Sequence, residues 1–323
     1  MAPTQPSKFY SIERDGLTQG TLALFLECRQ KAWYFLNGWS SKFPSFAITY
    51  GDIVHGILEI AYEDIRMGKL KSNPDKTRVR QYVSRIEKQW RTDNPRVDKK
   101  ALEFLEMSLL IAEATMPVYF DYWHKDFKEI AWRQLESEFK IPYKEGDVNS
   151  FLRGKMDGVF GKKDLWLFET KTKSRIEEGD LIDLLPFEHQ VNFYLYALRQ
   201  LFKKTPRGVL YNIVRRIGLQ QKQKEPIQVF SKRCVEDISK RPDFYFIRLE
   251  VSISEKEMDK YEGELHDLIR DFNAWWKGQA GQYKNTGACV NKYGRCQFLT
   301  ACATGRMSVY EKRKTVFREL EDK

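Results

Sequence analysis

The stretch Asp157–Lys171, DGVFGKKDLWLFETK, decides the fold of this 323-residue chain. Turn residues fill its middle and a short apolar run follows them, a pattern that predicts a β-hairpin. Because side chains alternate along a strand, Glu169 and Lys171 share one face while Thr170 points away. Asp157, on the neighbouring strand, can lie opposite them. The hairpin therefore brings two carboxylates and an ammonium to one place.

These three groups are the set that metal-assisted phosphodiester cleavage requires. Hard divalent cations such as Mg²⁺ bind carboxylate oxygens and keep several waters, so two acids are adequate for a site. Lys171 would hold or help activate the attacking water and balance charge on the scissile phosphate. The alternative is that acids and lysines beside a turn form a solvated hairpin end. Other residues in the chain favour the chemical interpretation.

Two helical patterns flank the hairpin. Upstream, His55 and Glu59 are four residues apart and so occupy one helix face. A histidine ligand would shift the preference from Mg²⁺ towards Mn²⁺, although a lone helical histidine is usually structural. Downstream, a helix that begins at Pro186 places Gln190 and Tyr194 four apart. These two could present an amide and a phenol to a phosphate or a metal-bound water, or they are boundary residues of an amphipathic helix.

In this order the motifs resemble the PD-(D/E)XK nuclease superfamily, and within it the branch that contains the RecB nuclease domain, Cas4 and exonuclease V. The motifs are Gly51-x3-His55, Gly154-Lys155-Met156-Asp157, Glu169-Thr170-Lys171 and Gln190-x3-Tyr194. The resemblance implies an α/β (α+β) fold whose core has the order αβββαβ around a central mixed sheet.

The resemblance also implies roles for individual residues. The implied ligands of Mg²⁺ or Mn²⁺ are His55, Asp157, Glu169 and the backbone carbonyl of Thr170. The implied catalytic set is Asp157, Glu169, the catalytic lysine Lys171, and Gln190 and Tyr194 of the branch's extra motif. Glu138 stands where the branch often has an acid ahead of the aspartate strand.

The chain has five cysteines: Cys28, Cys234, Cys289, Cys296 and Cys302. The last three are separated by six and five residues, and Cys28 stands alone near the other end. Three clustered thiolates and one remote thiolate suit a 4Fe-4S cluster or a tetrahedral zinc. The spacing fits neither common ferredoxin nor zinc-finger templates, so buried structural thiols are the first expectation from the residues alone.

The Cas4-like branch has one cysteine before the histidine motif and three after the nuclease core, the arrangement found here. The resemblance therefore implies that Cys28, Cys289, Cys296 and Cys302 hold an iron-sulfur cluster that joins the two chain ends, with zinc as the alternative. Many members have two residues between the first pair of the trio, whereas this chain has six. Cys234 lies outside the pattern and is expected to be an ordinary thiol.

Composition favours a polyanionic partner such as DNA. The chain carries 55 Lys and Arg against 45 Asp and Glu, a formal charge of +10, and 14% of its residues are aromatic and could stack on unpaired bases. The first 16 residues lack an apolar leader, and no run is long enough to span a bilayer. We expect a soluble, intracellular (cytoplasmic) protein, which suits reduced thiols better than disulfides.

The chain divides into three predicted regions. Residues 1–130 are mainly helical and carry Cys28 and His55, residues 131–252 form the nuclease core, and residues 253–323 hold a helix and the cysteine cluster. The predicted helices are 17–38, 51–67, 77–92, 98–125, 186–203 and 254–277. The predicted strands are 132–142, 151–160, 165–171, 208–214 and 244–251.

The sequence thus predicts a metal-dependent DNA nuclease, an exonuclease acting on single-stranded ends, with a structural iron-sulfur cluster. One alternative is a DNA-end binding or processing subunit of a larger recombination or CRISPR spacer-acquisition complex. Another is a nuclease-fold protein that acts on RNA. Phage recombination, host repair and adaptive immunity all stay open, as do cleavage polarity and oligomeric state.

Overall fold

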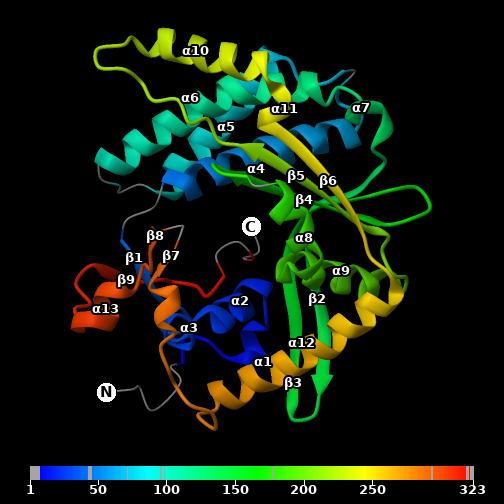
Figure 1. The fold of residues 1–323 in the computed structure, drawn as a ribbon, viewed down its shortest axis with the longest axis vertical. Helices are drawn as coiled ribbons and strands as arrows, with labels where there is room; N and C mark the ends of the chain where they lie inside the picture. The colour runs from blue at the N-terminus through cyan, green and yellow to red at the C-terminus, as the bar shows by residue number, and fades with distance from the viewer. Residues whose placement is uncertain are drawn as a thin grey trace.

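The computed structural model describes residues 8–42, 46–70, 72–94, 97, 99–176, 178–291, 294–317 and 320. Its centre is a five-stranded sheet of order β2-β3-β4-β5-β6, in which β4 and β5 are parallel and the other neighbours antiparallel (Figure 1). The strands are β2 (Trp132–Glu145), β3 (Val148–Phe160), β4 (Trp166–Lys173), β5 (Gly208–Arg215) and β6 (Phe246–Ser252). The mixed sheet confirms the predicted α/β class.

One face of the sheet is covered by a layer of long helices, drawn in the upper half of Figure 1. They are α4 (Phe46–Arg66), α5 (Lys76–Asp93), α6 (Lys99–Tyr122) and α10 (Ile227–Lys240). Successive residues of a strand point to opposite faces. Phe168 accordingly packs into the core under these helices, while Leu167 packs into a second core on the opposite face.

The opposite face is covered by α2 (Gln19–Glu27), α9 (His189–Phe202) and α12 (Glu255–Trp276). α12 begins with a capping box in which Ser254 accepts from the Glu257 backbone and Glu257 accepts from that of Ser254. The helix then presents a row of apolar side chains to the core, including Leu265, Ile269 and Phe272. None of the described helices combines the length and apolar character needed to cross a bilayer.

Segments from both ends of the chain lie together, at the lower left of Figure 1. β1 (Trp39–Ser41) pairs antiparallel with β9 (Tyr310–Lys312). Arg313 strengthens the connection, because it donates a hydrogen bond to the Phe35 carbonyl and lies over the Phe35 ring. A small apolar cluster of Phe298, Ala301 and Tyr310 lies beside this ladder.

The remaining elements are short. They are α1 (Ile12–Asp15), α3 (Arg29–Leu36), α7 (Asp126–Glu129), α8 (Glu178–Leu184), α11 (Pro242–Tyr245), α13 (Leu299–Thr304), the 3-10 turns Leu185–Phe187 and Thr286–Ala288, and the strands β7 (Val290–Asn291) and β8 (Gly294–Arg295).

Two predicted elements are broken or shortened in the structure, and the helix α10 (Ile227–Lys240) was not predicted. The helix predicted over 17–38 is broken at Cys28, whose extended backbone (φ −167°, ψ 118°) both ends α2 and precedes α3. The strand predicted from residue 244 begins only at Phe246, because Pro242 starts the one-turn helix α11. Both breaks are set by backbone geometry that apolar spacing does not record.

Candidate active site

Asp157 and Glu169 lie where two neighbouring strands separate. The pairing of β3 with β4 ends at Gly158 opposite Phe168, and Asp157 and Glu169 are the next residues beyond that pair on the two strands. Beyond that point the Asp157 carboxylate replaces the ladder, since its Oδ2 accepts a 2.7 Å hydrogen bond from the Thr170 backbone N–H. The sheet therefore holds both carboxylates at the point where β3 and β4 separate.

Lys171 and Gln190 hold the Glu169 carboxylate by one of its oxygens. The Lys171 ammonium donates to Glu169 Oε1 at 2.5 Å and to Gln190 Oε1 at 2.7 Å. The Gln190 amide donates back to Glu169 Oε1 at 2.8 Å. Strand β4 and helix α9 thus supply a closed triangle of polar contacts, as the i, i+2 spacing of Glu169 and Lys171 predicts.

The other oxygen of Glu169 has no such support. Glu169 is 1% exposed, and its Oε2 is buried without a hydrogen-bond partner among the described residues. Burial, opposed by Lys171 and assisted by Asp157, raises the pKa of Glu169 to about 7. A buried carboxylate oxygen that lacks a donor is the donor chemistry that suits a hard cation.

His55 reaches the same place from α4. Its Nδ1 lies 3.4 Å from Asp157 Oδ1. Burial lowers the pKa of His55, but the neighbouring Asp157 and Glu136 carboxylates outweigh it and raise the pKa to about 9. Burial opposes ionisation of Asp157 as well, yet His55 and Lys171 hold the pKa of that carboxyl below its ordinary value. In the metal-free protein the pair is therefore an imidazolium and a carboxylate.

Glu136 joins this group, and the sequence did not single it out. One ligand atom each of His55, Glu136 and Asp157 lies within 4.8 Å of the others, the one such group of His, Cys, Asp or Glu found in the described part of the chain. Glu136 also pairs with Lys155 at 2.5 Å. Burial and the Asp157 charge raise the pKa of Glu136 to about 7. The donor set therefore fits a divalent cation.

Glu138, the acid expected ahead of the aspartate strand, is exposed and lies outside this group. Register gives the reason. β2 and β3 are joined by a turn at which Glu145 pairs with Val148. Glu136 lies nine residues before Glu145 and Asp157 lies nine residues after Val148, so the antiparallel register places the two acids opposite each other. Glu138 instead pairs with Lys155, farther from the aspartate. Counting from the turn would have identified Glu136.

The other predicted site residues lie close by. Tyr194 is buried beside Gly154 and contacts Gln190, and burial followed by the Glu169 charge raises its pKa. Thr170 is 1% exposed and its side chain points to the opposite face of the sheet, towards Asn212. The structure thus brings His55, Asp157, Glu169, Lys171, Gln190 and Tyr194 close together, adds Glu136 to them and leaves Glu138 outside.

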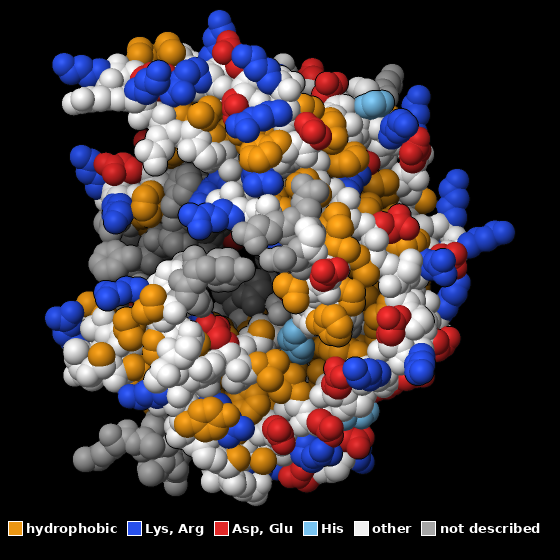
Figure 2. All heavy atoms as spheres, viewed as in Figure 1, with side chains coloured by type: hydrophobic (Ala, Val, Ile, Leu, Met, Phe, Trp, Pro, Cys, Tyr) orange, Lys and Arg blue, Asp and Glu red, His pale blue; other side chains and the backbone are white. Residues whose placement is uncertain are grey.

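A separate apolar cavity lies on another face of α9. Figure 2 shows apolar side chains gathered over α9 and α12, where a cavity of about 460 Å³ opens. Its lining includes Leu26, Phe187 and Tyr261 and does not include Gln190 or Tyr194. This cavity is therefore distinct from the carboxylate cluster.

The four cysteines that were expected to act together line one small pocket, with Lys31 and Lys284. Cys28 occupies the break between α2 and α3, and its Sγ accepts from the Asn285 backbone N–H at 3.4 Å. The thiols are not among the groups of three described ligands whose atoms all lie within 4.8 Å. Cys234 lies apart from them, on the buried face of α10.

Comparisons with known proteins address the family. The model of the PD-(D/E)XK nuclease superfamily matches residues 17–303. The chain is also similar to a crystal structure from Eubacterium rectale named "Putative exonuclease", with 12% identity, a TM-score of 0.45, and coverage of 93% of this chain and 91% of the other. The search of curated proteins found no match. Because the family match spans most of its length and both motif clusters, this chain belongs to the PD-(D/E)XK nuclease superfamily.

Proposed function

We propose that the protein is a metal-dependent deoxyribonuclease that hydrolyses phosphodiester bonds from single-stranded ends. The observation that carries the proposal is the buried Oε2 of Glu169, which has no hydrogen-bond partner among the residues that the structure describes and lies near a lysine, an aspartate and a histidine. A buried carboxylate that accepts hydrogen bonds at only one oxygen has a high free energy unless a cation or a proton binds the other oxygen. The proposed cation is Mg²⁺ or Mn²⁺.

The ligands in this proposal are His55, Asp157, Glu169 and the Thr170 carbonyl, with Glu136 added. A divalent cation bound there would activate a water and stabilise charge on the leaving oxygen. The Lys171 ammonium, held by Glu169 and Gln190, would orient the attacking water and offset charge that develops on the phosphate. Asp157, tied to the Thr170 backbone, keeps the two acid-bearing strands at a fixed separation.

The preference for DNA with free single-stranded ends rests on charge and aromatic exposure. The net charge of +10 draws a polyanion towards the protein. Phe187 lines the apolar cavity over α9 and α12, is 77% exposed and lies three residues before Gln190, so its ring is available to stack on an unpaired base. RNA, or binding without cleavage, would appear directly in the assay below.

The test is cleavage of 5′- and 3′-labelled DNA strands with Mn²⁺ by the wild type and by Lys171→Ala. We expect the variant to lose about 10²–10⁴-fold in rate while it still binds the strand. The matched control is Lys163→Ala in the turn that joins β3 to β4, which should cut like the wild type. Cleavage by Lys171→Ala at the wild-type rate would reject the mechanism.

For the second metal centre we propose an iron-sulfur cluster held by Cys28, Cys289, Cys296 and Cys302. The support is that these four thiols, from segments far apart in the chain, line a single pocket. Four thiolates around zinc, at about 2.3 Å each, would bring their sulfurs within about 4 Å of one another. Among the described residues, no three of these thiols lie within 4.8 Å of one another, so the pocket is wider than a closed tetrahedral zinc site.

In this proposal the cluster has a structural role. The pocket lies beside the β1–β9 ladder, so a cluster there would tie the N-terminal region 1–130 and the C-terminal region 253–323 around the core 131–252. Anaerobic purification should yield a brown protein that absorbs near ~400 nm. Cys296→Ser should lose the colour and Cys234→Ser should keep it. A colourless protein with stoichiometric zinc would overturn the cluster.

A further inference from the structure

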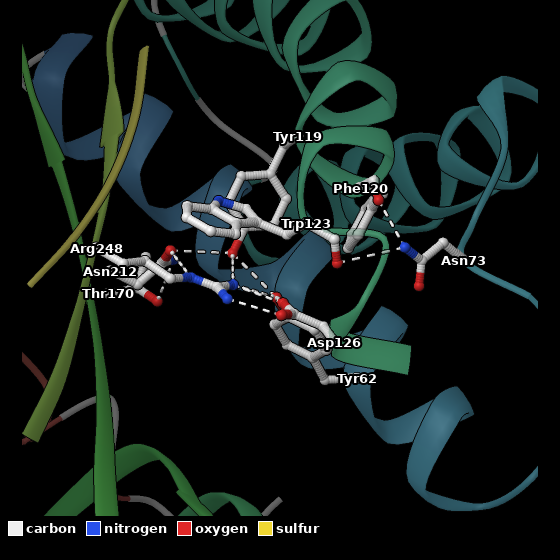
Figure 3. Close-up of polar contacts among 9 residues, drawn as sticks. All are labelled: Tyr62, Asn73, Tyr119, Phe120, Trp123, Asp126, Thr170, Asn212 and Arg248. Atoms are coloured by element: carbon white, nitrogen blue, oxygen red, sulfur yellow. Dashed lines mark hydrogen bonds and ion pairs between the residues drawn. The ribbon is translucent and has the colours of Figure 1, made fainter. Parts of the chain in front are cut away.

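A buried ion pair lies behind the candidate site, on the face of the sheet that α4 and α6 cover (Figure 3). Arg248 of β6 donates to both carboxylate oxygens of Asp126, at 2.7 and 2.5 Å. The same guanidinium donates to the hydroxyls of Tyr119 at 3.0 Å and Tyr62 at 3.3 Å, and its Nε donates to Asn212 Oδ1 at 3.1 Å. All three nitrogens of the guanidinium are therefore engaged by elements that are far apart in the sequence.

Asn212 connects the ion pair to the candidate site. Its Oδ1 accepts from Arg248 and from Tyr119, so its amide nitrogen must point the other way. That nitrogen donates to Thr170 Oγ1 at 3.2 Å, across the parallel pairing of Thr170 with Asn212. The Thr170 backbone N–H in turn donates to Asp157. A continuous chain of polar contacts thus runs from the ion pair to the site carboxylates.

The same ion pair also holds the helix that carries His55. Tyr62 of α4 donates to Asp126 Oδ2 at 2.8 Å. Tyr62 follows His55 by seven residues, which is two helical turns or about 10.5 Å along the axis, so the two side chains leave α4 on the same side. The separation of α4 from β4 is therefore fixed by contacts that converge on Arg248 and Asp126.

Burying an arginine and an aspartate is costly, and apolar residues of similar volume often give equal or better stability. Arg248 and Asp126 have 9% and 8% of their side chains exposed. What apolar residues could not supply is a directional link between the histidine-bearing helix, the Thr170 side chain and the aspartate strand. The geometry therefore indicates a role in orientation more than in stability.

We propose that Arg248, Asp126 and Asn212 are positioning residues that hold Thr170 and His55 in register for divalent-cation binding. This inference rests on the proposed function, because it concerns the same metal site. Partners of this kind, one shell out from the ligands, typically change metal affinity by about 10–100-fold when they are removed.

The experiment measures Mn²⁺ binding to the full chain by calorimetry, independently of cleavage. Thr170→Val keeps the side-chain volume but removes the hydroxyl that accepts from Asn212, whereas Thr170→Ser keeps the hydroxyl. Asn212→Ala removes the link itself. Asn273→Ala is its matched control, because Asn273 is also buried but lies in α12 and contacts Asp147. Arg248→Lys keeps the charge and loses the planar fork.

We expect Thr170→Val, Asn212→Ala and Arg248→Lys to weaken Mn²⁺ binding by about tenfold or more, and Thr170→Ser and Asn273→Ala to bind like the wild type. If Arg248→Lys does not fold, the comparison of Thr170→Val with Thr170→Ser still tests the proposal. Wild-type binding that is lost in Glu169→Gln but unchanged in Thr170→Val and Asn212→Ala would overturn this inference alone. Absence of Mn²⁺ binding by the wild type would overturn the proposed function and this inference with it.

Discussion

Lys171 and Glu169 stand two residues apart in β4, and the ammonium of Lys171 donates to Glu169 Oε1, an oxygen that also accepts from Gln190. The carboxylate is thereby divided into one oxygen saturated by protein donors and one, Oε2, that is buried without a partner in the described part of the chain. One strand therefore supplies both an oxygen able to hold a cation and an ammonium able to orient a water.

The first prediction concerns Gln190, which accepts from Lys171 and donates to Glu169. Gln190→Ala leaves both charged groups in place but removes the amide that orients them, so we expect cleavage to fall by about 10–100-fold. Steady-state kinetics with Mn²⁺ should show the loss mainly in kcat. Gln200→Ala, on the same helix, should stay near wild type, and equal losses in the two variants would contradict the orienting role.

The second prediction separates two acids of β2. Glu136 lies with His55 and Asp157, whereas Glu138 is exposed outside that group. Glu136→Gln should weaken Mn²⁺ binding by about tenfold, because it removes a charged oxygen at ligand distance. Glu138→Gln should leave the affinity unchanged. Calorimetric titration of both proteins decides it, and equal affinities would remove Glu136 from the ligand set.

Glu136 and Glu138 also show which features of the fold and the site can be predicted from the sequence. Most of the strand and helix order was predictable because the apolar runs are short and end at Gly and Pro, although α10 was not predicted, and the motif spacing pointed to His55, Asp157 and Glu169. Choosing between Glu136 and Glu138 needs the β2–β3 register, which depends on the turn between Glu145 and Val148. That turn is visible in the sequence, so Glu136 was within reach of a register count.

The Arg248 network was not predictable in the same way. Its members Tyr62, Asp126 and Arg248 lie on three elements spread over nearly 190 residues, and only tertiary packing brings them together. The break at Cys28 is a similar case, because its extended backbone serves a contact with Asn285 near the other end of the chain. Local patterns carry no information on contacts of that range.

The third prediction is that the metal-free protein loses stability as pH rises. His55 has a folded pKa of about 9, above its ordinary 6.5, so its contribution is complete below pH 6.5 and is lost as pH rises through 9. Glu169 has a folded pKa of about 7, above its ordinary 4.5, so the folded state binds that proton more tightly and stability falls between these values. Both groups act in the same direction.

Urea unfolding of EDTA-treated protein should therefore show a midpoint that falls steadily from about pH 5 to about pH 9. His55→Gln removes the upper part of that fall and keeps the lower part. Saturating Mn²⁺ should flatten the profile, because the ligands must then be deprotonated. A midpoint that rises over this range would contradict the raised pKa of His55.

The fourth prediction concerns protons released on metal binding. At pH 7.5 the metal-free His55 is protonated, and Glu169 is partly so, since their pKa values are about 9 and about 7. Binding of Mn²⁺ should release at least about one proton, because a ligating imidazole is neutral. Calorimetry in two buffers of different ionisation enthalpy measures the number. Release that disappears in His55→Gln would assign the proton, and no release in the wild type would exclude His55 as a ligand.

The fifth prediction tests the packing that holds Tyr194 beside the site. A Cβ on Gly154 would lie 3.0 Å from the Phe139 ring and 3.1 Å from the Tyr194 ring, closer than side chains ordinarily approach. Gly154→Ala should therefore cost about 1–3 kcal/mol in the free energy of unfolding, through overpacking. It should also slow cleavage, because one of the two rings that would be displaced is Tyr194, which contacts Gln190.

Gly263→Ala is the matched control for that substitution. Gly263 lies exposed within α12, and a Cβ built there would meet no described atom within 4 Å beyond its chain neighbours and the backbone of its own helical turns. Replacing a helical glycine by alanine should stabilise the protein by about 0.5–1 kcal/mol and leave cleavage unchanged. Denaturant unfolding and rate measurements on the two variants thus separate the backbone effect of replacing glycine from the effect of overpacking. A Gly154→Ala protein as stable and as active as the wild type would mean that Tyr194 has room to move, and a residue with that freedom could not help to fix Gln190 against Lys171.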